Sequence, residues 1–213
     1  MLPFLPDYLV EKTVKPLISE RSVTGKQSSL SLLFNLLGIF LFQAANMGLF
    51  AYMISLGKAD GLSLEFMSNA LGVASWVALI GAFLVIVIGT KFGRTIPVIS
   101  AILLTAICSW VLHFSSSEMV YLIANIIIGI TWAFVLPYLF GICSELDKSG
   151  QMAALGGFAS KMGLASGPMV AALLLNNDVH GNESYQQVIN FAVVGLIFCS
   201  VVVFKPARGL DSY

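Results

Sequence analysis

The chain has 213 residues, of which 58% are hydrophobic and only 10% are charged, and its formal net charge is zero. A soluble globular domain carries about 25% charged residues, so this composition excludes an ordinary soluble domain, and the neutral balance argues against a basic surface for nucleic acid. The three cysteines lie singly in apolar stretches. We interpret them as packing residues and expect no metal and no cofactor.

Six apolar stretches fill most of the chain after residue 28. A bilayer core about 30 Å thick is crossed by about 20 helical residues, and in lipid a helix satisfies its own backbone hydrogen bonds whereas an open sheet does not. We therefore predict an all-α, polytopic membrane protein with six transmembrane helices. The predicted spans are residues 29–56, 65–89, 95–114, 119–143, 151–175 and 185–204.

Basic residues indicate how the bundle lies in the membrane. Nine of the eleven Lys and Arg residues fall on one predicted side, whereas Lys58 is on the other side and Lys161 lies within a span. Cytoplasmic loops are enriched in Lys and Arg, so we expect both termini in the cytoplasm and the bundle in the cell (inner) membrane. Residues 1–28 are then a cytoplasmic arm or connector, residues 29–204 the bundle, and residues 205–213 a cytoplasmic tail.

Polar side chains inside the spans are the candidates for a binding site. On the first span, Asn35, Gln43 and Asn46 lie on the same side of the helix, and on the fourth span Asn125 and Trp132 do so. Two explanations fit this pattern. The residues form hydrogen bonds between helices, each worth about 0.6 kcal/mol in a membrane, or they line a substrate cavity.

Lys161 is the most informative single residue, because a lysine at the centre of a span costs about 2.5–3.5 kcal/mol on insertion scales. The same span carries small residues at helical spacing, which let two helices approach closely: Gly156, Ser160, Gly163 and Gly167. At about 100° per residue, Lys161 points away from this stripe. It therefore meets an anionic group in a polar cavity, pairs with a neighbouring helix, or extends its stem to the membrane surface.

The turn after the second span carries a specific motif. Residues 90–94, with the sequence T-K-F-G-R, resemble the loop motif of the major facilitator superfamily, whose core is D-R/K-x-G-R. The matching positions are Lys91, Gly93 and Arg94, which the resemblance implies to be loop and gating residues. In the fourth span, Pro137 removes a backbone hydrogen bond, which fits either a gating bend or a static kink.

A second match lies further along the chain. The acidic, glycine-containing turn at residues 145–150 and the G-x-x-x-G-P stretch at residues 163–168 resemble the eleventh helix of that superfamily. The resemblance covers about residues 29–204 and implies the C-terminal six-helix half of a transporter, built as a 3+3 inverted-repeat bundle. Our first and fourth spans would correspond to the seventh and tenth of the full protein, which line its central cavity.

The resemblance implies transmembrane transport of a small solute by alternating access, in a secondary active transporter of half length or a fragment of one. Lys161 favours an anionic substrate. One bundle cannot enclose such a site, so the expected partners are the lipid bilayer, a small-molecule substrate and a second six-helix half, from another chain or a second copy. The alternative is a non-transporting membrane assembly or regulatory subunit. Motifs of membrane enzymes such as HExxH are not found, so we expect no enzymatic activity.

Overall fold

The computed structural model describes residues 25–146, 151–175 and 182–211, and this part of the chain is helical with no strand. Most of the predicted N-terminal arm, the turn at residues 147–150 and the last two residues of the predicted tail lie outside the described residues. The helices in chain order are α1 (Gly25–Phe50), α2 (Met53–Ala59), α3 (Leu64–Val77), α4 (Leu79–Ile88), α5 (Thr95–Val111), the 3-10 helix η1 (Leu112–Phe114), α6 (Glu118–Leu146), α7 (Gln151–Leu175) and α8 (Asn182–Asp211).

Six helical stretches in the described residues are long and apolar enough to cross a membrane. They are Ser29–Phe50, Leu64–Ile88, Thr95–Phe114, Glu118–Leu146, Gln151–Leu175 and Ser184–Asp211. The predicted fold class is confirmed in its main features: the chain is an all-α, polytopic membrane protein, with six spanning helices in the described residues. The 3+3 inverted-repeat arrangement stays a prediction.

The main differences from the predicted spans lie in the first two and in the sixth, which was expected to end at residue 204, whereas α8 continues into the predicted tail as far as Asp211. The first was expected to reach residue 56, but α1 ends at Phe50 and α2 follows as a separate short helix. The second is divided at Ala78, between α3 and α4. The start of α3 does carry a sequence signal, since the Ser63 side chain accepts a hydrogen bond from the Phe66 N–H at 3.2 Å, as an N-cap serine does.

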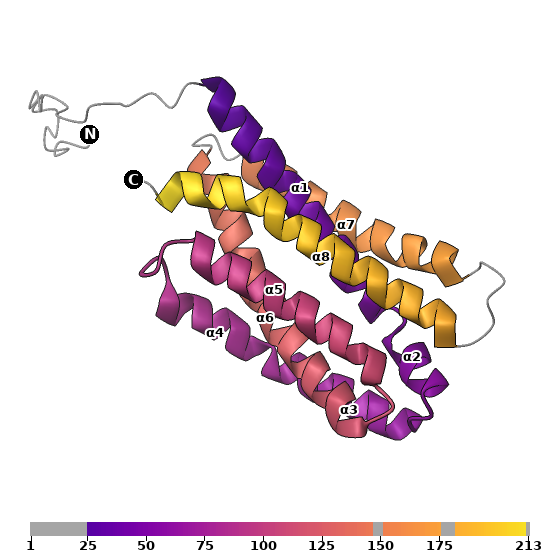
Figure 1. Ribbon diagram of the computed structural model, residues 1–213. Coiled ribbons are helices and arrows are strands. Elements are labelled where there is room, and N and C mark those ends of the chain that lie inside the picture. Colours follow the sequence, from indigo (N-terminus) through magenta and orange to yellow (C-terminus); the bar gives the residue numbers. More distant parts are fainter. Residues whose placement is uncertain (1–24, 147–150, 176–181, 212–213) are drawn as a thin grey trace, which may run out of the picture.

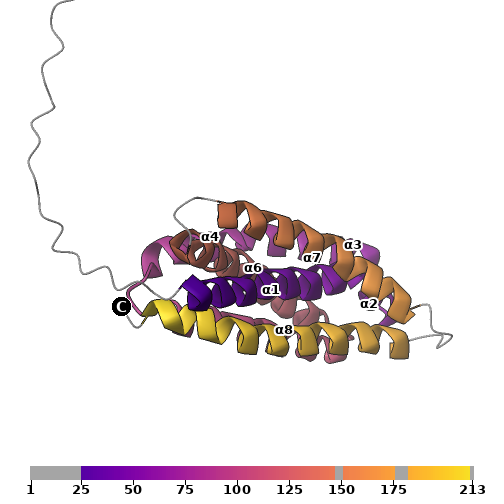
Figure 2. The same ribbon diagram turned by 90° about the horizontal axis from the view of Figure 1, so that it is seen from above.

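The helices lie in three layers (Figures 1 and 2). α1 and α6 form the middle layer, α5 and α8 cover one side of it, and α7 and the α3–α4 pair lie on the other side. α7 packs along α1, while α3 and α4 pack along α6. The line of contact between α1 and α6, which we call the α1–α6 seam, therefore lies between α7 and the α3–α4 pair. This arrangement positions the candidate site described below.

Small residues explain how α7 comes so close to α1. A Cβ atom added at Gly163 would lie 2.4 Å from the Phe40 carbonyl oxygen, and one added at Gly167 would lie 2.2 Å from the Ala44 carbonyl oxygen. Such distances are shorter than any van der Waals contact, so only glycine fits at both positions. The close approach predicted from the small-residue stripe of this span is thus present, and its partner is α1.

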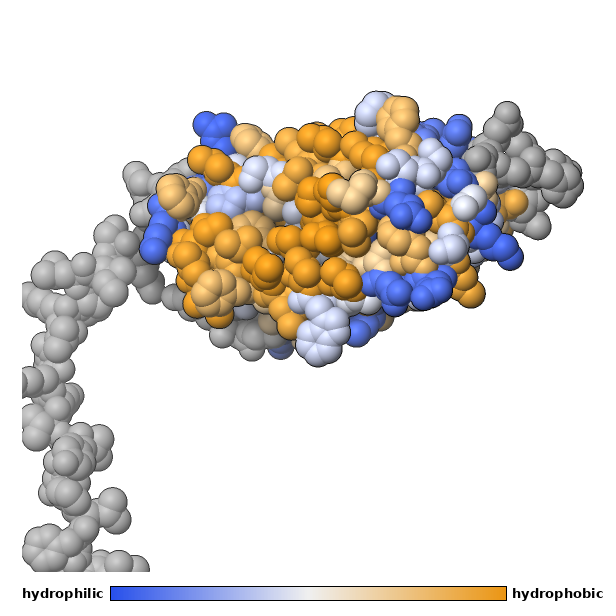
Figure 3. Space-filling model, turned by 90° about the horizontal axis from the view of Figure 1, so that it is seen from below, coloured by the Kyte–Doolittle hydropathy of each residue, from blue (hydrophilic) through white to orange (hydrophobic). Residues whose placement is uncertain are grey.

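The surface is apolar around its middle. Figure 3 shows a broad hydrophobic band, with hydrophilic residues concentrated toward the two ends. Large apolar side chains lie open on this surface, for example Trp76 on α3, 77% exposed, and Ile86 on α4, 79% exposed. A contiguous exposed apolar surface of this kind marks contact with a membrane or another protein.

One end of the bundle gathers the start of α1, the α4–α5 turn, the end of α6 and the end of α8 (Figure 1). Most of the basic residues in the described ranges belong to these segments: Lys91, Arg94, Lys205 and Arg208. Lys58 follows α1 and lies toward the other end, as the predicted topology requires. The side of the membrane that each end faces stays a prediction.

Candidate functional site

Three side chains from three helices form a continuous hydrogen-bonded chain inside the bundle. The Trp132 indole N–H on α6 donates to the Gln43 side-chain oxygen on α1 at 2.7 Å, and the Gln43 amide nitrogen donates to the Ser160 hydroxyl on α7 at 2.7 Å. An indole N–H only donates, so it fixes which end of the Gln43 amide faces each partner. Trp132 is the middle residue of α6, and the chain of bonds therefore crosses the bundle at mid-span.

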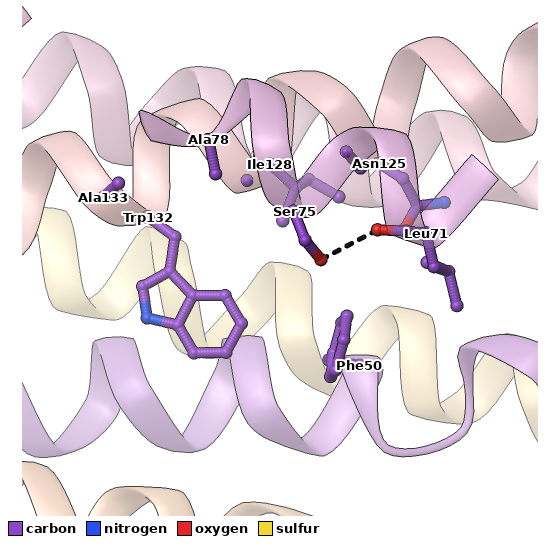
Figure 4. Close-up of a pocket in the computed structure, with 10 residues that line it drawn as sticks. Phe50, Leu71, Ser75, Ala78, Asn125, Ile128, Trp132 and Ala133 are labelled. Carbon is purple, nitrogen blue, oxygen red and sulfur yellow. Dashed lines mark hydrogen bonds between the residues drawn. The ribbon is translucent and has the colours of Figure 1, made fainter. Parts of the chain in front are cut away.

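A cavity of about 330 Å³ lies beside this hydrogen-bonded chain, between α1, α3 and α6 (Figure 4). Its volume is in the range of small-molecule sites, about 300–1,000 Å³. Ten residues line it: Phe50, Leu71, Ala74, Ser75, Ala78, Asn125, Ile128, Gly129, Trp132 and Ala133. Two of these, Asn125 and Trp132, are residues that the sequence singled out, so the structure brings both predicted residues of the fourth span to one cavity.

The remaining predicted residues of the first span are buried away from the cavity. The Asn35 amide nitrogen donates to the Leu139 carbonyl oxygen at 2.8 Å and contacts the Cys143 sulfur at 3.1 Å, which ties α1 to α6. The Asn46 amide nitrogen donates to the Phe42 carbonyl oxygen of its own helix at 2.8 Å. Neither residue lines the cavity, and Gln43 reaches it only through Trp132.

Lys161 lies near the middle of α7, whose surface divides into three faces at about 100° per residue. The face packed on α1 is formed by buried small residues, Gly156, Ser160, Gly163, Gly167 and Ala171. A second face exposes bulky apolar side chains, as lipid contact requires: Leu155, Phe158, Met162, Met169 and Leu173. Lys161 lies on the third face, among the small residues Ala154, Gly157, Ala165, Pro168 and Ala172.

The Lys161 side chain is exposed on that third face. It forms no hydrogen bond or ion pair with any residue in the described ranges. The preceding residue, Ser160, is the last of the three hydrogen-bonded residues that begin with Trp132. Lys161 itself takes no part in these hydrogen bonds. The ammonium group is therefore available to a group that the described residues do not supply.

The predicted loop motif lies at the end of the bundle where α5 begins. Gly93 has a φ angle of +70°, a conformation that favours glycine. The Asp211 carboxylate at the end of α8 accepts hydrogen bonds from the backbone N–H groups of Arg94, at 2.6 Å, and Thr95, at 2.8 Å. The Arg94 guanidinium forms a salt bridge with Glu145 near the end of α6. The motif thus joins α5, α6 and α8 at one end.

The other two predicted loop and gating residues are exposed. Lys91 lies in the turn between α4 and α5, and Pro137 lies inside α6. Proline has no N–H, so the carbonyl group of Ala133, which lines the cavity, lacks its usual helical donor. One residue later, the Tyr138 hydroxyl donates to the Gly89 carbonyl oxygen at 2.7 Å and links α6 to the α4–α5 turn.

A family model described as the Major Facilitator Superfamily matches residues 6–206. The chain belongs to the major facilitator superfamily. Searches of curated proteins and of solved structures give no match. Members of this superfamily are membrane transporters and not enzymes, so the chain has a transporter function, with the lipid bilayer and a small-molecule substrate as its partners. It is an integral membrane protein, which the six long apolar helices of the described residues also support.

In this superfamily member, four of the residues that sequence reasoning missed bear directly on the candidate site and its surroundings. Phe50 and Ser75 line the cavity, Ser160 accepts the hydrogen bond from Gln43, and Asp211 caps the start of α5. A hydroxyl within a stripe of glycines could have indicated Ser160. The other three residues have no motif or spacing that distinguishes them. No cluster of His, Cys, Asp and Glu suited to a metal ion occurs among the described residues.

Proposed function

We propose that the chain is a secondary active transporter that moves a small solute by alternating access, with its substrate held against the α1–α6 seam. The observation that carries the proposal is the chain of hydrogen bonds from Trp132 through Gln43 to Ser160, beside a cavity. Polar side chains inside a membrane cost free energy and mark substrate pathways. Transporters of this kind bind their substrates near the middle of the bilayer, at the interface between repeats.

A second six-helix bundle completes the site in this proposal. The α1–α6 seam lies between α7 and the α3–α4 pair, and the second bundle, from another chain or a second copy, would pack over it. The two bundles rock about the seam and expose it to each side of the membrane in turn. Both termini face the cytoplasm, and the membrane is the cell (inner) membrane.

The position of Lys161 favours a substrate that carries a negatively charged group. It is exposed on a face of α7 that lacks bulky lipid-facing side chains, and no described residue neutralises it. An ammonium group within a membrane-spanning helix is costly and pairs with a group of opposite charge. In the proposed complex that partner is an anionic group of the substrate, which would lie at the depth of Ser160.

The test uses a cysteine in place of Ser75, which lines the cavity. The three native cysteines, Cys108, Cys143 and Cys199, are replaced by alanine, and sealed membrane vesicles of both orientations are treated with a membrane-impermeant maleimide. Alternating access predicts reaction of Ser75→Cys from both sides. A Lys58→Cys control, at an exposed position in α2, should react from one side only.

Solute transport is measured in the same vesicles with a panel of labelled small solutes. The proposal expects at least one solute whose movement depends on the parent chain and is lost with Trp132→Ala. Reaction of Ser75→Cys from a single side, with no solute moved, would show a static bundle. That result would favour the alternative of a non-transporting membrane subunit.

A further inference from the structure

The lining of the cavity beside Trp132 is uncharged and mostly apolar. We infer that it takes an uncharged, ring-shaped or otherwise compact apolar group that carries a hydrogen-bond donor. This inference rests on the proposed function, because it names the class of substrate for the same site.

The first observation is charge. None of the ten residues that line the cavity is acidic or basic. An ionised group moved from water into an apolar site without a partner of opposite charge is strongly disfavoured. Lys161 is not part of the lining. The cavity therefore selects against ions and accepts a neutral group.

The second observation is the aromatic wall. The rings of Phe50 and Trp132 meet edge to face, with their centroids 6.1 Å apart and their planes at 76°, and Figure 4 shows both rings at the cavity. The Trp132 N–H is already used by Gln43, so the indole offers its carbon surface and not a donor. Aromatic surfaces favour flat apolar partners in offset or edge-to-face arrangements.

The third observation is the pair of polar groups left in the wall. The Asn125 amide nitrogen donates to the Tyr121 carbonyl oxygen at 2.8 Å. A carbonyl only accepts, so this bond fixes the amide orientation, and the Asn125 side-chain oxygen then has no partner among the described residues. The Ser75 hydroxyl donates to the Leu71 carbonyl oxygen at 2.8 Å, as Figure 4 shows. Its oxygen is left as an acceptor.

Both polar groups can therefore accept a hydrogen bond from a ligand. An acceptor that stays without a donor when the site loses its water costs free energy. A ligand with a hydroxyl or N–H group removes that cost, whereas a ligand of the same shape without a donor does not. The wall thus selects for a donor on an apolar body, and it distinguishes phenol from anisole, in which the hydroxyl hydrogen is replaced by a methyl group.

The fluorescence of Trp132 reports binding in the cavity. The other two tryptophans, Trp76 and Trp110, are 77% and 51% exposed, so both are replaced by phenylalanine in the full-length chain. The fluorescence of Trp132 is then followed during titration with phenol, anisole and benzoate in lipid nanodiscs. We expect phenol to bind several-fold and up to about tenfold more tightly than anisole, as one net hydrogen bond provides, and benzoate to bind least.

Two variants separate the cavity from general partitioning into lipid. Asn125→Leu removes one of the two acceptors, so the preference for phenol over anisole should shrink, with the affinity for anisole retained as evidence of an intact fold. Asn69→Leu makes the same change at an exposed position of α3 outside the cavity, and should leave the preference for phenol unchanged. If Asn125→Leu does not assemble, Ser75→Ala provides the same comparison without added volume.

Tighter binding of benzoate than of phenol overturns the inference, and so does equal binding of phenol and anisole to the parent. The expected order combined with no solute transport would support the inference and overturn the proposed function. Transport that depends on Trp132, combined with no response of its fluorescence to any probe, would do the reverse. The two failures are therefore distinguishable.

Discussion

The Trp132 indole N–H donates to the Gln43 side-chain oxygen across 2.7 Å and joins the middle of α6 to α1. The same Gln43 side chain donates to Ser160 on α7, so one amide holds three helices together at the seam. A hydrogen bond of this kind orients the Trp132 ring in the cavity wall. Gln43 is thus a positioning residue that acts through Trp132.

Replacing Gln43 by leucine tests this arrangement. Gln43→Leu leaves the Trp132 N–H and the Ser160 hydroxyl without their partner, and each interhelical bond is worth about 0.6 kcal/mol in a membrane. We expect a loss of about 1–2 kcal/mol in unfolding free energy, measured by thermal unfolding in detergent, together with loss of transport. Gln186→Leu, at an exposed position of α8, is the control. Equal unfolding midpoints for the two variants would contradict the prediction.

The approach of α7 to α1 predicts a sharp contrast between two glycines. At Gly163 a Cβ atom would lie 2.4 Å from the Phe40 carbonyl oxygen, whereas at Gly157 no atom lies within 4 Å. Gly163→Ala should destabilise the bundle by about 1–3 kcal/mol through overpacking. Gly157→Ala should leave it unchanged or slightly more stable, because alanine is the better helix former. Thermal unfolding of the two variants checks this, and a similar effect at both positions would refute it.

The sequence predicts the spans well because hydrophobic length and the composition of the turns decide them locally. It also predicts the small-residue stripe of α7, since Gly156, Ser160, Gly163 and Gly167 recur at helical spacing. It does not predict the end of α1 at Phe50, because the apolar run continues past that point without glycine or proline until Gly57.

The sequence predicts only part of the candidate site, for a similar reason. Asn35 and Gln43 share a face of α1, yet Asn35 meets the backbone of Leu139 while Gln43 meets Trp132. Spacing places residues on a face but does not say which neighbouring helix they reach. Partners such as Ser160 depend on the packing of three helices, which is information that no single span carries.

The salt bridge between Arg94 and Glu145 ties the start of α5 to the end of α6. The Glu145 side chain is 45% exposed, so we expect Glu145→Gln to cost no more than about 1 kcal/mol. Arg94→Glu should cost more, and the double variant Arg94→Glu with Glu145→Arg should recover most of the loss. Unfolding is measured at low salt and at about 1 M salt, where screening should shrink the differences. Lys91→Gln, at an exposed neighbouring position, is the control.

Orientation is checked with single cysteines. Cysteines in place of Lys91 and Lys205 should react with an impermeant maleimide from the cytoplasmic side only, and one in place of Lys58 from the opposite side only, because these positions lie at opposite ends of the bundle. The native cysteines are buried, Cys143 and Cys199 completely, so the background reaction should be slow. Reaction of Lys205→Cys from outside would reverse the predicted topology.

Lys161 should matter through its charge. It lies near the middle of α7, is exposed on a face without bulky side chains, and has no ion-pair partner among the described residues. Lys161→Met should therefore leave the unfolding midpoint unchanged while abolishing transport, and Lys161→Arg should retain part of the transport activity. Lys58→Met makes the same substitution at an exposed position near the other end of the bundle and should alter neither property.

A lower unfolding midpoint for Lys161→Met would instead indicate a buried ion pair, because removing one member leaves a lone charge on its partner. Unchanged stability together with unchanged transport would defeat both explanations and leave a lysine whose stem reaches the membrane surface.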